Sequence, residues 1–427
     1  MRGPAMHRTI DLGSRYLFPT YARAPIVIVS GRGCRVVDAD GREYLDLLGG
    51  IAVNALGHAH PRIVEALREA TGNDETILHC SNLYHHPFQA PLAARLAELF
   101  DLPRVFFCNS GSEAIEAALK IARAHARRTK GNDALGIVAL EGSFHGRTAF
   151  ALSATGRDEY RAPFGPLVED IAFVPPDDAR ALTRAVTGRT AAVLLEPVQG
   201  EGGVRPIDDA VLQAARAACD DAGALLIADE VQCGLGRTGA WSACRQSGAA
   251  PDLITLAKPL AAGLPLGAVV GREDLAADLG PGMHGSTFGG GPLPCRLALA
   301  FLDAVDGEEL LDAVAARGRQ LIEGLRSLAS RHGALREVRG RGLMIGVEME
   351  RPVAPILDAL REEGILAGSA GANTLRLLPP FVVSVEEIDR FLDTFDGVLA
   401  RAAATGARNT TGARSEATVL PEAGGRS

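Results

Sequence analysis

Short apolar runs alternate with amphipathic segments through the middle of the chain. The apolar runs are Val105–Cys108, Gly136–Leu140, Ile171–Val174, Ala191–Leu195, Ala224–Ala228, Leu253–Leu256 and Ala268–Val270. Most of them are continuously apolar, which is typical of strands covered on both faces. Helical patterns such as Glu113–Arg128 and Ala210–Asp221 lie between them. This alternation predicts an α/β fold, in which helices wrap a mainly parallel sheet.

The pattern changes after about residue 300, where two long helical segments frame shorter strands at Gly342–Glu348 and Thr374–Leu377. We therefore expect a large domain at 66–300 and a smaller α+β domain at 301–403. Residues 1–65 contain a predicted hairpin with its turn at Asp38–Gly41, and this N-terminal segment is expected to pack with the small domain. The first dozen residues are expected to be loosely structured. Residues 404–427 lack periodicity and are expected to form a disordered tail.

Composition narrows the class of protein. The chain has 427 residues, 47% of them hydrophobic, and a formal net charge of -8 without a basic run. These values disfavour nucleic acid or an anionic membrane as a partner. No apolar stretch approaches the roughly 20 residues of a membrane helix, and the N-terminus lacks the apolar region of a secretory signal. The seven cysteines are scattered without CxxC spacing, which favours reduced thiols in a cytoplasmic protein over a metal site or disulfides.

Polar clusters follow several predicted strands, where ligands of parallel sheets gather. In VFFCNSGSE, Ser110 and Glu113 fit a capping box, so the N–H groups of Gly111 and Ser112 would form a phosphate site. The alternative is a capped helix that binds nothing. In LLIADEVQ, Asp229 ends a strand and requires a cationic or hydrogen-bonding partner. A protonated ring nitrogen is one such partner, and the alternatives are that the acid caps a helix or forms an internal salt bridge.

Lys258 also follows an apolar strand. Loss of water around its amine would lower its pKa and make it a nucleophile toward aldehydes, whereas the alternative is a lysine that extends to solvent. In EGSFHGRT, Phe144 offers a face on which a flat ring could stack, and Arg147 could bind a carboxylate through two hydrogen bonds. The alternative is that Phe144 packs in the core and Arg147 forms a structural ion pair. His145 is interpreted as a pocket-wall residue. A further acid, Glu196, ends another strand.

These motifs occur together in a recognisable order. NSGSE, FHGRT, EPVQGEGG, DEVQCGLGRTG, LAK and HGSTFGG are spread over roughly residues 21–400. In this order and spacing the chain resembles the class III aminotransferases, a fold type I group that depends on pyridoxal 5'-phosphate. The group includes ornithine, acetylornithine and 4-aminobutyrate aminotransferases. The segments GGIAVNALGHAHP, SNLYHH and LRLLPP most resemble the acetylornithine branch.

The resemblance implies a role for each matching residue. Lys258 would attach the cofactor covalently and move the proton, and Asp229 would keep the pyridine nitrogen protonated. The other implied cofactor contacts are Gly111 and Ser112 at the phosphate, Phe144 on the ring, Glu230, Val231 and Gln232 alongside it, and Thr287 from a neighbouring subunit. The implied substrate contacts are Arg147, Ser286 and Arg376, with Glu201 as an alternate partner for Arg376. No metal is implied.

The resemblance also implies an activity. The expected reaction moves the δ-amino group of N2-acetyl-L-ornithine to 2-oxoglutarate, in a homodimer with shared active sites. The alternative within the family is another amine donor: ornithine, succinylornithine, 4-aminobutyrate, or an acylated or carrier-bound lysine. A silent scaffold protein would need neither Lys258 nor Asp229, whereas an epimerase or aminomutase would keep both.

Overall fold

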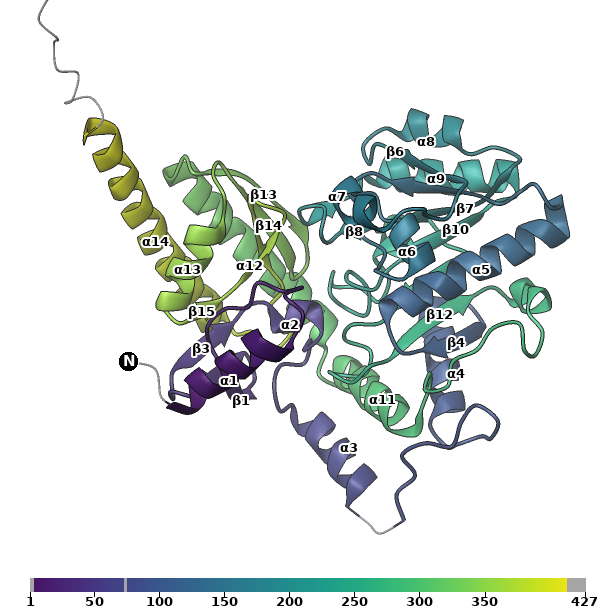
Figure 1. The fold of residues 1–427 in the computed structure, drawn as a ribbon, viewed down its shortest axis with the longest axis horizontal. Coiled ribbons are helices and arrows are strands. Elements are labelled where there is room, and N and C mark those ends of the chain that lie inside the picture. The colour runs from purple at the N-terminus through teal and green to yellow at the C-terminus, as the bar shows by residue number, and fades with distance from the viewer. Residues whose placement is uncertain (1–3, 73–74, 413–427) are drawn as a thin grey trace, which may run out of the picture.

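The computed structural model describes residues 4–72 and 75–412, and Figure 1 shows a large domain beside a smaller one. A seven-stranded sheet forms the centre of the large domain, in the order β4-β12-β11-β10-β7-β5-β6. Its strands are β4 (Arg104–Cys108), β5 (Gly136–Leu140), β6 (Ile171–Val174), β7 (Thr190–Leu195), β10 (Leu225–Asp229), β11 (Leu253–Leu256) and β12 (Gly267–Gly271). β12 is the only strand of this sheet that runs in the opposite direction to the other six, so the expected mainly parallel sheet is confirmed.

Both faces of this sheet are covered by helices, which accounts for the continuous apolar runs. In β10, Leu225 and Ile227 belong to a core shared with α5 (Gly111–Lys130). Leu226 and Ala228 belong to the core on the opposite face. The helices of that face include α4 (Gln89–Phe100), α9 (Asp209–Ala222) and α11 (Pro292–Gly307).

Shorter elements connect the strands of the large domain. They are α6 (Ala149–Ser153), α7 (Asp158–Arg161), α8 (Ala179–Ala185) and α10 (Ala243–Gln246), the 3₁₀ turns η1 (Ala162–Phe164) and η2 (Glu273–Asp278), and the two-stranded pair β8 (Val198–Gln199) and β9 (Arg205–Pro206).

The smaller domain is built on an antiparallel sheet in the order β13-β14-β17-β16. Its strands are β13 (Leu335–Arg341), β14 (Met344–Met349), β16 (Gly368–Ala370) and β17 (Thr374–Leu377), and its helices are α12 (Leu310–Arg331), α13 (Ala354–Glu362) and α14 (Val385–Gly412). Figure 1 shows α12, α13 and α14 grouped at this side of the molecule. The strand β17 carries Arg376, which pairs with Glu201 of the large domain.

The N-terminal segment contributes a hairpin to a second small sheet. Its elements are α1 (Pro4–Tyr16), β1 (Ile28–Arg32), β2 (Arg35–Asp38), β3 (Glu43–Asp46), α2 (Gly49–Ala52) and α3 (Pro61–Thr71). The expected turn is present: the Gly41 N–H donates to the Asp38 carbonyl at 2.9 Å, and Gly41 takes a φ of 81°. β3 pairs in parallel with β15 (Ile365–Leu366), which precedes β16.

Some expectations at the ends of the chain differ from the structure. The first dozen residues, expected to be loose, include helix α1. Helix α14 continues through Gly412, into the segment expected to be disordered from 404 onward, and residues 413–427 lie outside the described part of the chain. The expected domain boundaries at 65/66 and 300/301 fall inside α3 and α11, so the division into domains at those points remains a prediction. None of the helices described is long and apolar enough to cross a membrane.

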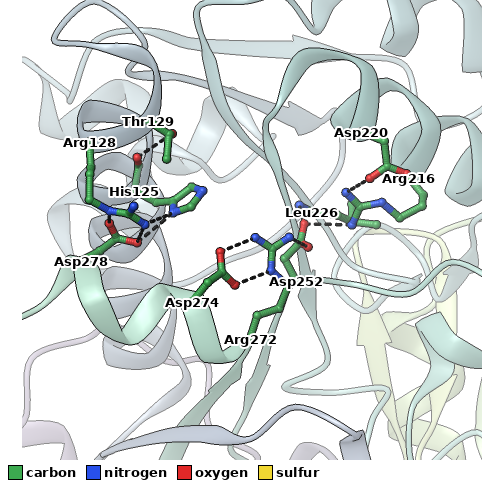
Figure 2. A network of polar contacts seen from close by, with 10 residues as sticks. All are labelled: His125, Arg128, Thr129, Arg216, Asp220, Leu226, Asp252, Arg272, Asp274 and Asp278. Atoms are coloured by element: carbon green, nitrogen blue, oxygen red, sulfur yellow. Dashed lines mark hydrogen bonds and ion pairs between the residues drawn. The ribbon is translucent and has the colours of Figure 1, made fainter.

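Ion pairs surround the start of β11 and the 3₁₀ turn η2 (Figure 2). Asp252 stands directly before β11 and is almost fully buried. Its carboxylate accepts hydrogen bonds from Arg216 at 2.9 Å, Arg272 at 2.5 Å and the Leu226 N–H at 2.7 Å. A second buried acid, Asp278, pairs with His125 and Arg128 of α5. Buried carboxylates need such partners, so these contacts fix β11 and η2 in place.

Candidate active site

A cavity of about 360 Å³ lies where the strands of the large sheet end. Its walls come from the segments that follow five of these strands: Asn109–Ser112 after β4, Phe144–Gly146 after β5, Glu196 after β7, Asp229, Val231 and Gln232 from β10 onward, and Ala257–Lys258 after β11. The parallel arrangement therefore gathers residues that are more than 100 positions apart in sequence.

The start of α5 forms one wall of this cavity. Ser110 caps the helix, since its hydroxyl accepts from the Glu113 N–H at 3.2 Å. The first N–H groups of a helix lack partners within it and attract anions. Gly111 is required here because a Cβ at that position would lie 2.8 Å from the Val231 Cγ1 atom. Gly111 and Ser112 thus offer free N–H groups to a phosphate at the cavity wall.

Asp229 is held by partners on both of its carboxylate oxygens. Oδ1 accepts from the Val231 N–H at 3.1 Å and from the Thr255 hydroxyl at 3.3 Å. Oδ2 lies 2.7 Å from the His145 Nδ1 atom, and both side chains are buried. This arrangement fixes the carboxylate in one orientation at the cavity wall. His145, read from the sequence as a wall residue, therefore contacts Asp229 directly.

Lys258 also lines the cavity, two residues beyond the end of β11. Burial lowers the pKa of its amine, while the negative charges of Asp229 and Glu196 act in the opposite direction. Among the described residues, the amine makes no hydrogen bond or ion pair. An amine that is shifted toward its neutral form and free of partners is suited to nucleophilic attack on an aldehyde.

Glu196 is a site residue whose role the sequence did not reveal. Its two oxygens accept from the Phe144 N–H at 2.8 Å and the Gly200 N–H at 2.9 Å, so it joins two loops of the cavity wall. Burial, together with the nearby charge of Asp229, raises the pKa of this carboxyl to about 7. Only the position of Glu196 at a strand end signalled it in the sequence.

Glu230 is turned away from the cavity, in contrast to the expected contact with the cofactor. Its carboxylate accepts from the Ser242 hydroxyl at 2.6 Å and from the N–H groups of Ala243 and Cys244 at 2.9 and 3.0 Å. It therefore caps α10. Neighbouring side chains of an extended segment point in opposite directions, and Asp229 takes the direction toward the cavity.

The two arginines implied in substrate binding lie in different environments. Arg376, on β17, is buried, and its guanidinium pairs with the Glu201 carboxylate. Arg147 is exposed, and its guanidinium lies 4.1 Å from the ring centre of Tyr160 and 5.3 Å from that of Phe144. The Arg147 guanidinium has no ion pair within the described residues, which leaves it free to bind a carboxylate.

Ser286 and Thr287 do not line this cavity. The Ser286 hydroxyl accepts from the Asn109 side-chain amide at 3.0 Å and from the Gly289 N–H at 3.0 Å. Thr287 is exposed on the outer side of the same loop. Within one chain, the structure therefore brings neither hydroxyl to the phosphate position at Gly111 and Ser112.

The residues present fit pyridoxal 5'-phosphate. The Gln232 side-chain oxygen and the His145 Nε2 atom are buried without a partner, as unfilled positions of a polar ligand site are. The start of α5 suits a phosphate, the Phe144 ring suits a flat heterocycle, and Asp229 suits a protonated ring nitrogen. No group of three or more His, Cys, Asp or Glu side chains that could hold a metal occurs within 4–72 and 75–412.

Comparisons with known proteins agree with this geometry. The model of the family "Aminotransferase class-III" matches residues 17–399. An acetylornithine aminotransferase of Methanocaldococcus jannaschii is 45% identical over 391 residues, which cover 91% of this chain and 97% of the relative. An acetylornithine aminotransferase of Myxococcus xanthus is 43% identical over 382 residues, covering 89% and 94%.

Solved structures extend the agreement to the fold. The ornithine aminotransferase of Toxoplasma gondii ME49 superposes with a TM-score of 0.90 at 33% identity, over 95% of this chain and 97% of that one. The N-acetylornithine aminotransferase of Stenotrophomonas maltophilia K279a gives a TM-score of 0.79 at 34% identity, over 93% and 100%. The chain therefore belongs to the class III aminotransferases and is a fold type I transaminase that depends on pyridoxal 5'-phosphate.

Proposed function

We propose that this enzyme transfers the δ-amino group of N2-acetyl-L-ornithine to 2-oxoglutarate. The products are N-acetyl-L-glutamate 5-semialdehyde and L-glutamate, as in arginine biosynthesis. The observation that carries the proposal is the pairing of Arg376 with Glu201, a residue of the cavity wall, while the guanidinium of Arg147, which follows the wall residue Gly146, has no ion pair within the described residues. The acetylornithine aminotransferases that are 43–45% identical over about nine-tenths of the chain support the same donor.

This arrangement suits two substrates of different charge. N-acetylornithine has one carboxylate, far from its reacting amine, which Arg147 would hold through a bidentate pair. 2-Oxoglutarate has a second carboxylate beside its reacting carbon, and Arg376 would hold that one. With the amine donor bound, Glu201 keeps the buried Arg376 charge paired; with 2-oxoglutarate bound, Glu201 moves aside.

The residues around the cofactor have separate tasks. Bound pyridoxal 5'-phosphate supplies an electron sink for the carbon that carries the amine. Lys258, with its lowered pKa, holds the cofactor and carries the proton at its Nζ atom. Asp229, oriented by His145 and Thr255, keeps a proton on the ring nitrogen. The Gln232 amide would be available to the phenolic oxygen, and Phe144 would cover the ring face.

We further propose a homodimer in which each subunit completes the site of the other. Two segments that are joined by hydrogen bonds from the Asn82 side chain expose large apolar side chains: Ile77, Leu78, Leu83 and Tyr84 in the first, and Met283 and Phe288 in the second. Such patches are typical of interfaces. Thr287 lies in the second segment, so a dimer formed through it would carry this hydroxyl to the phosphate of the partner. The proposed location is the cytoplasm.

A panel of amine donors tests the proposed substrate. N-acetylornithine, ornithine, succinylornithine, 4-aminobutyrate and acetyl-lysine are each incubated with 2-oxoglutarate, and glutamate formation is measured. N-acetylornithine is expected to give the highest kcat/KM. Ornithine is the second candidate, because a Toxoplasma gondii ornithine aminotransferase superposes over 95% of the chain. A higher kcat/KM for any other donor contradicts the proposed substrate.

A further inference from the structure

Two arginines from opposite domains bind the backbone of residues 201–203, called the switch loop below. Arg157 directly precedes α7 of the large domain, and its Nη1 atom donates to the Glu201 carbonyl at 2.6 Å. Arg339 lies on β13 of the small domain, and its Nε atom donates to the Gly203 carbonyl at 2.8 Å. The switch loop is therefore held at its first and last carbonyls by charged donors, which make stronger hydrogen bonds than neutral ones.

The contacts around the switch loop leave its backbone little freedom. Gly203 has a φ of 101°, and a Cβ there would lie 2.8 Å from the Arg339 Nη2 atom. Arg339 is fixed in turn by Glu348 at 2.7 Å and by Glu337 at 2.7 Å. On the other side, Gly200 donates to Glu196 at 2.9 Å, which anchors the chain just before the loop. The loop is thus fixed by both domains.

The Glu201 side chain, in contrast, has space on two sides. Glu201 lines the cofactor cavity of about 360 Å³ and also a second cavity of about 730 Å³ between the two domains. The Glu201 side chain is 23% exposed to solvent, whereas the side chain of its partner Arg376 is 5% exposed. In the proposed switch, a rotation of this side chain would carry the carboxylate away from Arg376 and toward the second cavity.

We propose that Arg157 and Arg339 are positioning residues that clamp the switch loop, so that only the Glu201 side chain moves when the substrate changes. This proposal rests on the function proposed above, in which Glu201 and a substrate carboxylate compete for Arg376. A clamped backbone keeps the Glu201 carboxylate at a high effective concentration near Arg376. The clamp thereby sets how strongly a carboxylate of glutamate or 2-oxoglutarate must compete with Glu201 for Arg376.

Arg157→Met tests the clamp because it removes one loop contact and leaves Arg376 and Glu201 in place. A less constrained Glu201 competes less well, so the KM for glutamate is expected to fall roughly tenfold, the ratio that one charge-assisted hydrogen bond represents. The limiting rate with glutamate should stay within about twofold of wild type, since no group that touches the reacting atoms is altered. Arg157→Lys keeps one charged donor and should restore the wild-type KM.

Arg161→Met is the matched control. Arg161 also lines the second cavity, also pairs with a nearby acid and also lies over an aromatic ring, and its side chain is 18% exposed against 21% for Arg157. No hydrogen bond joins Arg161 to the switch loop in the described structure. Arg161→Met should therefore leave the KM for glutamate unchanged.

A double-mutant cycle connects the effect to Glu201. In the Glu201→Ala background the clamp has no carboxylate to position, so adding Arg157→Met should change the KM for glutamate by less than about twofold. A second readout uses the enzyme without cofactor. Hydrogen exchange of a peptide spanning residues 199–206, which includes the Val204 N–H bonded to the Gly200 carbonyl at 3.2 Å, should accelerate in Arg157→Met and not in Arg161→Met.

Three results would overturn the clamp: equal changes in Arg157→Met and Arg161→Met, a KM effect that persists without Glu201, or unchanged exchange of the 199–206 peptide. Failure of the proposed substrate looks different. In that case N-acetylornithine produces no change in the absorbance spectrum of the wild-type enzyme, whereas glutamate still produces one. The double-mutant cycle of Arg157→Met and Glu201→Ala can then still be completed with glutamate. If neither substrate reacts, the hydrogen-exchange comparison alone decides whether Arg157 holds the loop.

Discussion

The His145 Nδ1 atom lies 2.7 Å from the Asp229 Oδ2 atom, and both side chains are buried. His145 thus fixes the orientation of the carboxylate that, in the proposed function, would face the ring nitrogen of the cofactor. Thr255 and the Val231 N–H hold the other oxygen, so the carboxylate is preorganised before any ligand binds. Such fixed charges contribute strongly because they need no reorganisation during the reaction.

Asp229→Asn is therefore expected to fold normally and to lose most activity. The amide preserves the shape of the side chain but removes the charge that keeps the pyridine nitrogen protonated. We expect kcat to fall by at least about 10²–10³-fold, the usual loss for one preorganised electrostatic group. Steady-state kinetics measure the loss, and circular dichroism checks the fold. Near wild-type kcat would show that Asp229 is only a structural acid.

Lys258 is expected to carry the cofactor. The purified enzyme should be yellow, and borohydride should convert the bond between Lys258 and the cofactor aldehyde into a stable secondary amine. Lys258→Ala should still bind the cofactor through its phosphate but lose turnover by many orders of magnitude, since both the attachment and the proton carrier are gone. Peptide mapping after reduction provides the measurement. An adduct on a different lysine would contradict the assignment.

The proposed dimer predicts complementation between two inactive variants. Lys258→Ala disables the site in its own subunit, and Thr287→Arg disables the site of its partner. A mixed dimer then keeps one intact site, so refolding an equal mixture should restore about a quarter of wild-type activity by random pairing. Each variant refolded alone serves as the control. An active monomer at nanomolar concentration would refute the shared site.

The ion pairs of Asp278 lead to the prediction that the free energy of unfolding falls in acid. Burial alone would raise the pKa of this carboxyl, but Arg128 and His125 bring the pKa below its ordinary value. Because the folded pKa is lowered, the contribution to stability is complete above the unfolded pKa of about 3.9 and is lost as pH falls through the folded pKa. Asp278→Asn should lower the free energy of unfolding by about 1.5–3 kcal/mol at pH 7. The difference from wild type should shrink toward pH 3 in urea unfolding, and a constant difference would exclude the charge as its cause.

Sequence patterns located the strands well because burial on both faces leaves a clear signature. The observed bounds of β5, β6 and β11 coincide with the expected apolar runs. The direction of individual side chains was less accessible. Glu230 follows Asp229 in a promising motif, yet it turns to cap α10, whose start lies more than ten residues further along the chain.

Contacts between distant segments could not be read from the pattern at all. His145 and Asp229 are 84 positions apart, and Arg376 and Glu201 are 175 apart. Each pair exists because two strands end at the same edge of a sheet or because two domains meet. The Glu201–Arg376 pair was expected only through family resemblance, whereas the hydrogen bonds from Arg157 and Arg339 to the switch loop had no signal in the sequence.

The Arg376–Glu201 pair leads to an asymmetric prediction for the two half-reactions. In the proposed function, Arg376 would meet a substrate carboxylate only when 2-oxoglutarate or glutamate is bound, while Arg147 would meet the distal carboxylate of both substrates. Arg376→Ala should therefore reduce the 2-oxoglutarate half-reaction roughly 30- to 4,000-fold, which corresponds to about 2–5 kcal/mol for a lost partner of a buried charge pair. The N-acetylornithine half-reaction should change far less, and Arg147→Ala should slow both.

Glu201→Ala separates this switch from a simple loss of packing. Without the carboxylate, the buried Arg376 charge has no partner when N-acetylornithine is bound, and that state becomes costly. Glutamate supplies its own carboxylate to Arg376 and no longer competes with Glu201, so preference should shift toward glutamate. Single-turnover absorbance measurements on each half-reaction resolve the two effects. Equal losses in both halves for Arg376→Ala would exclude the switch, because a residue that merely supports the pocket has no reason to distinguish a substrate with a carboxylate beside its reacting carbon from one without it.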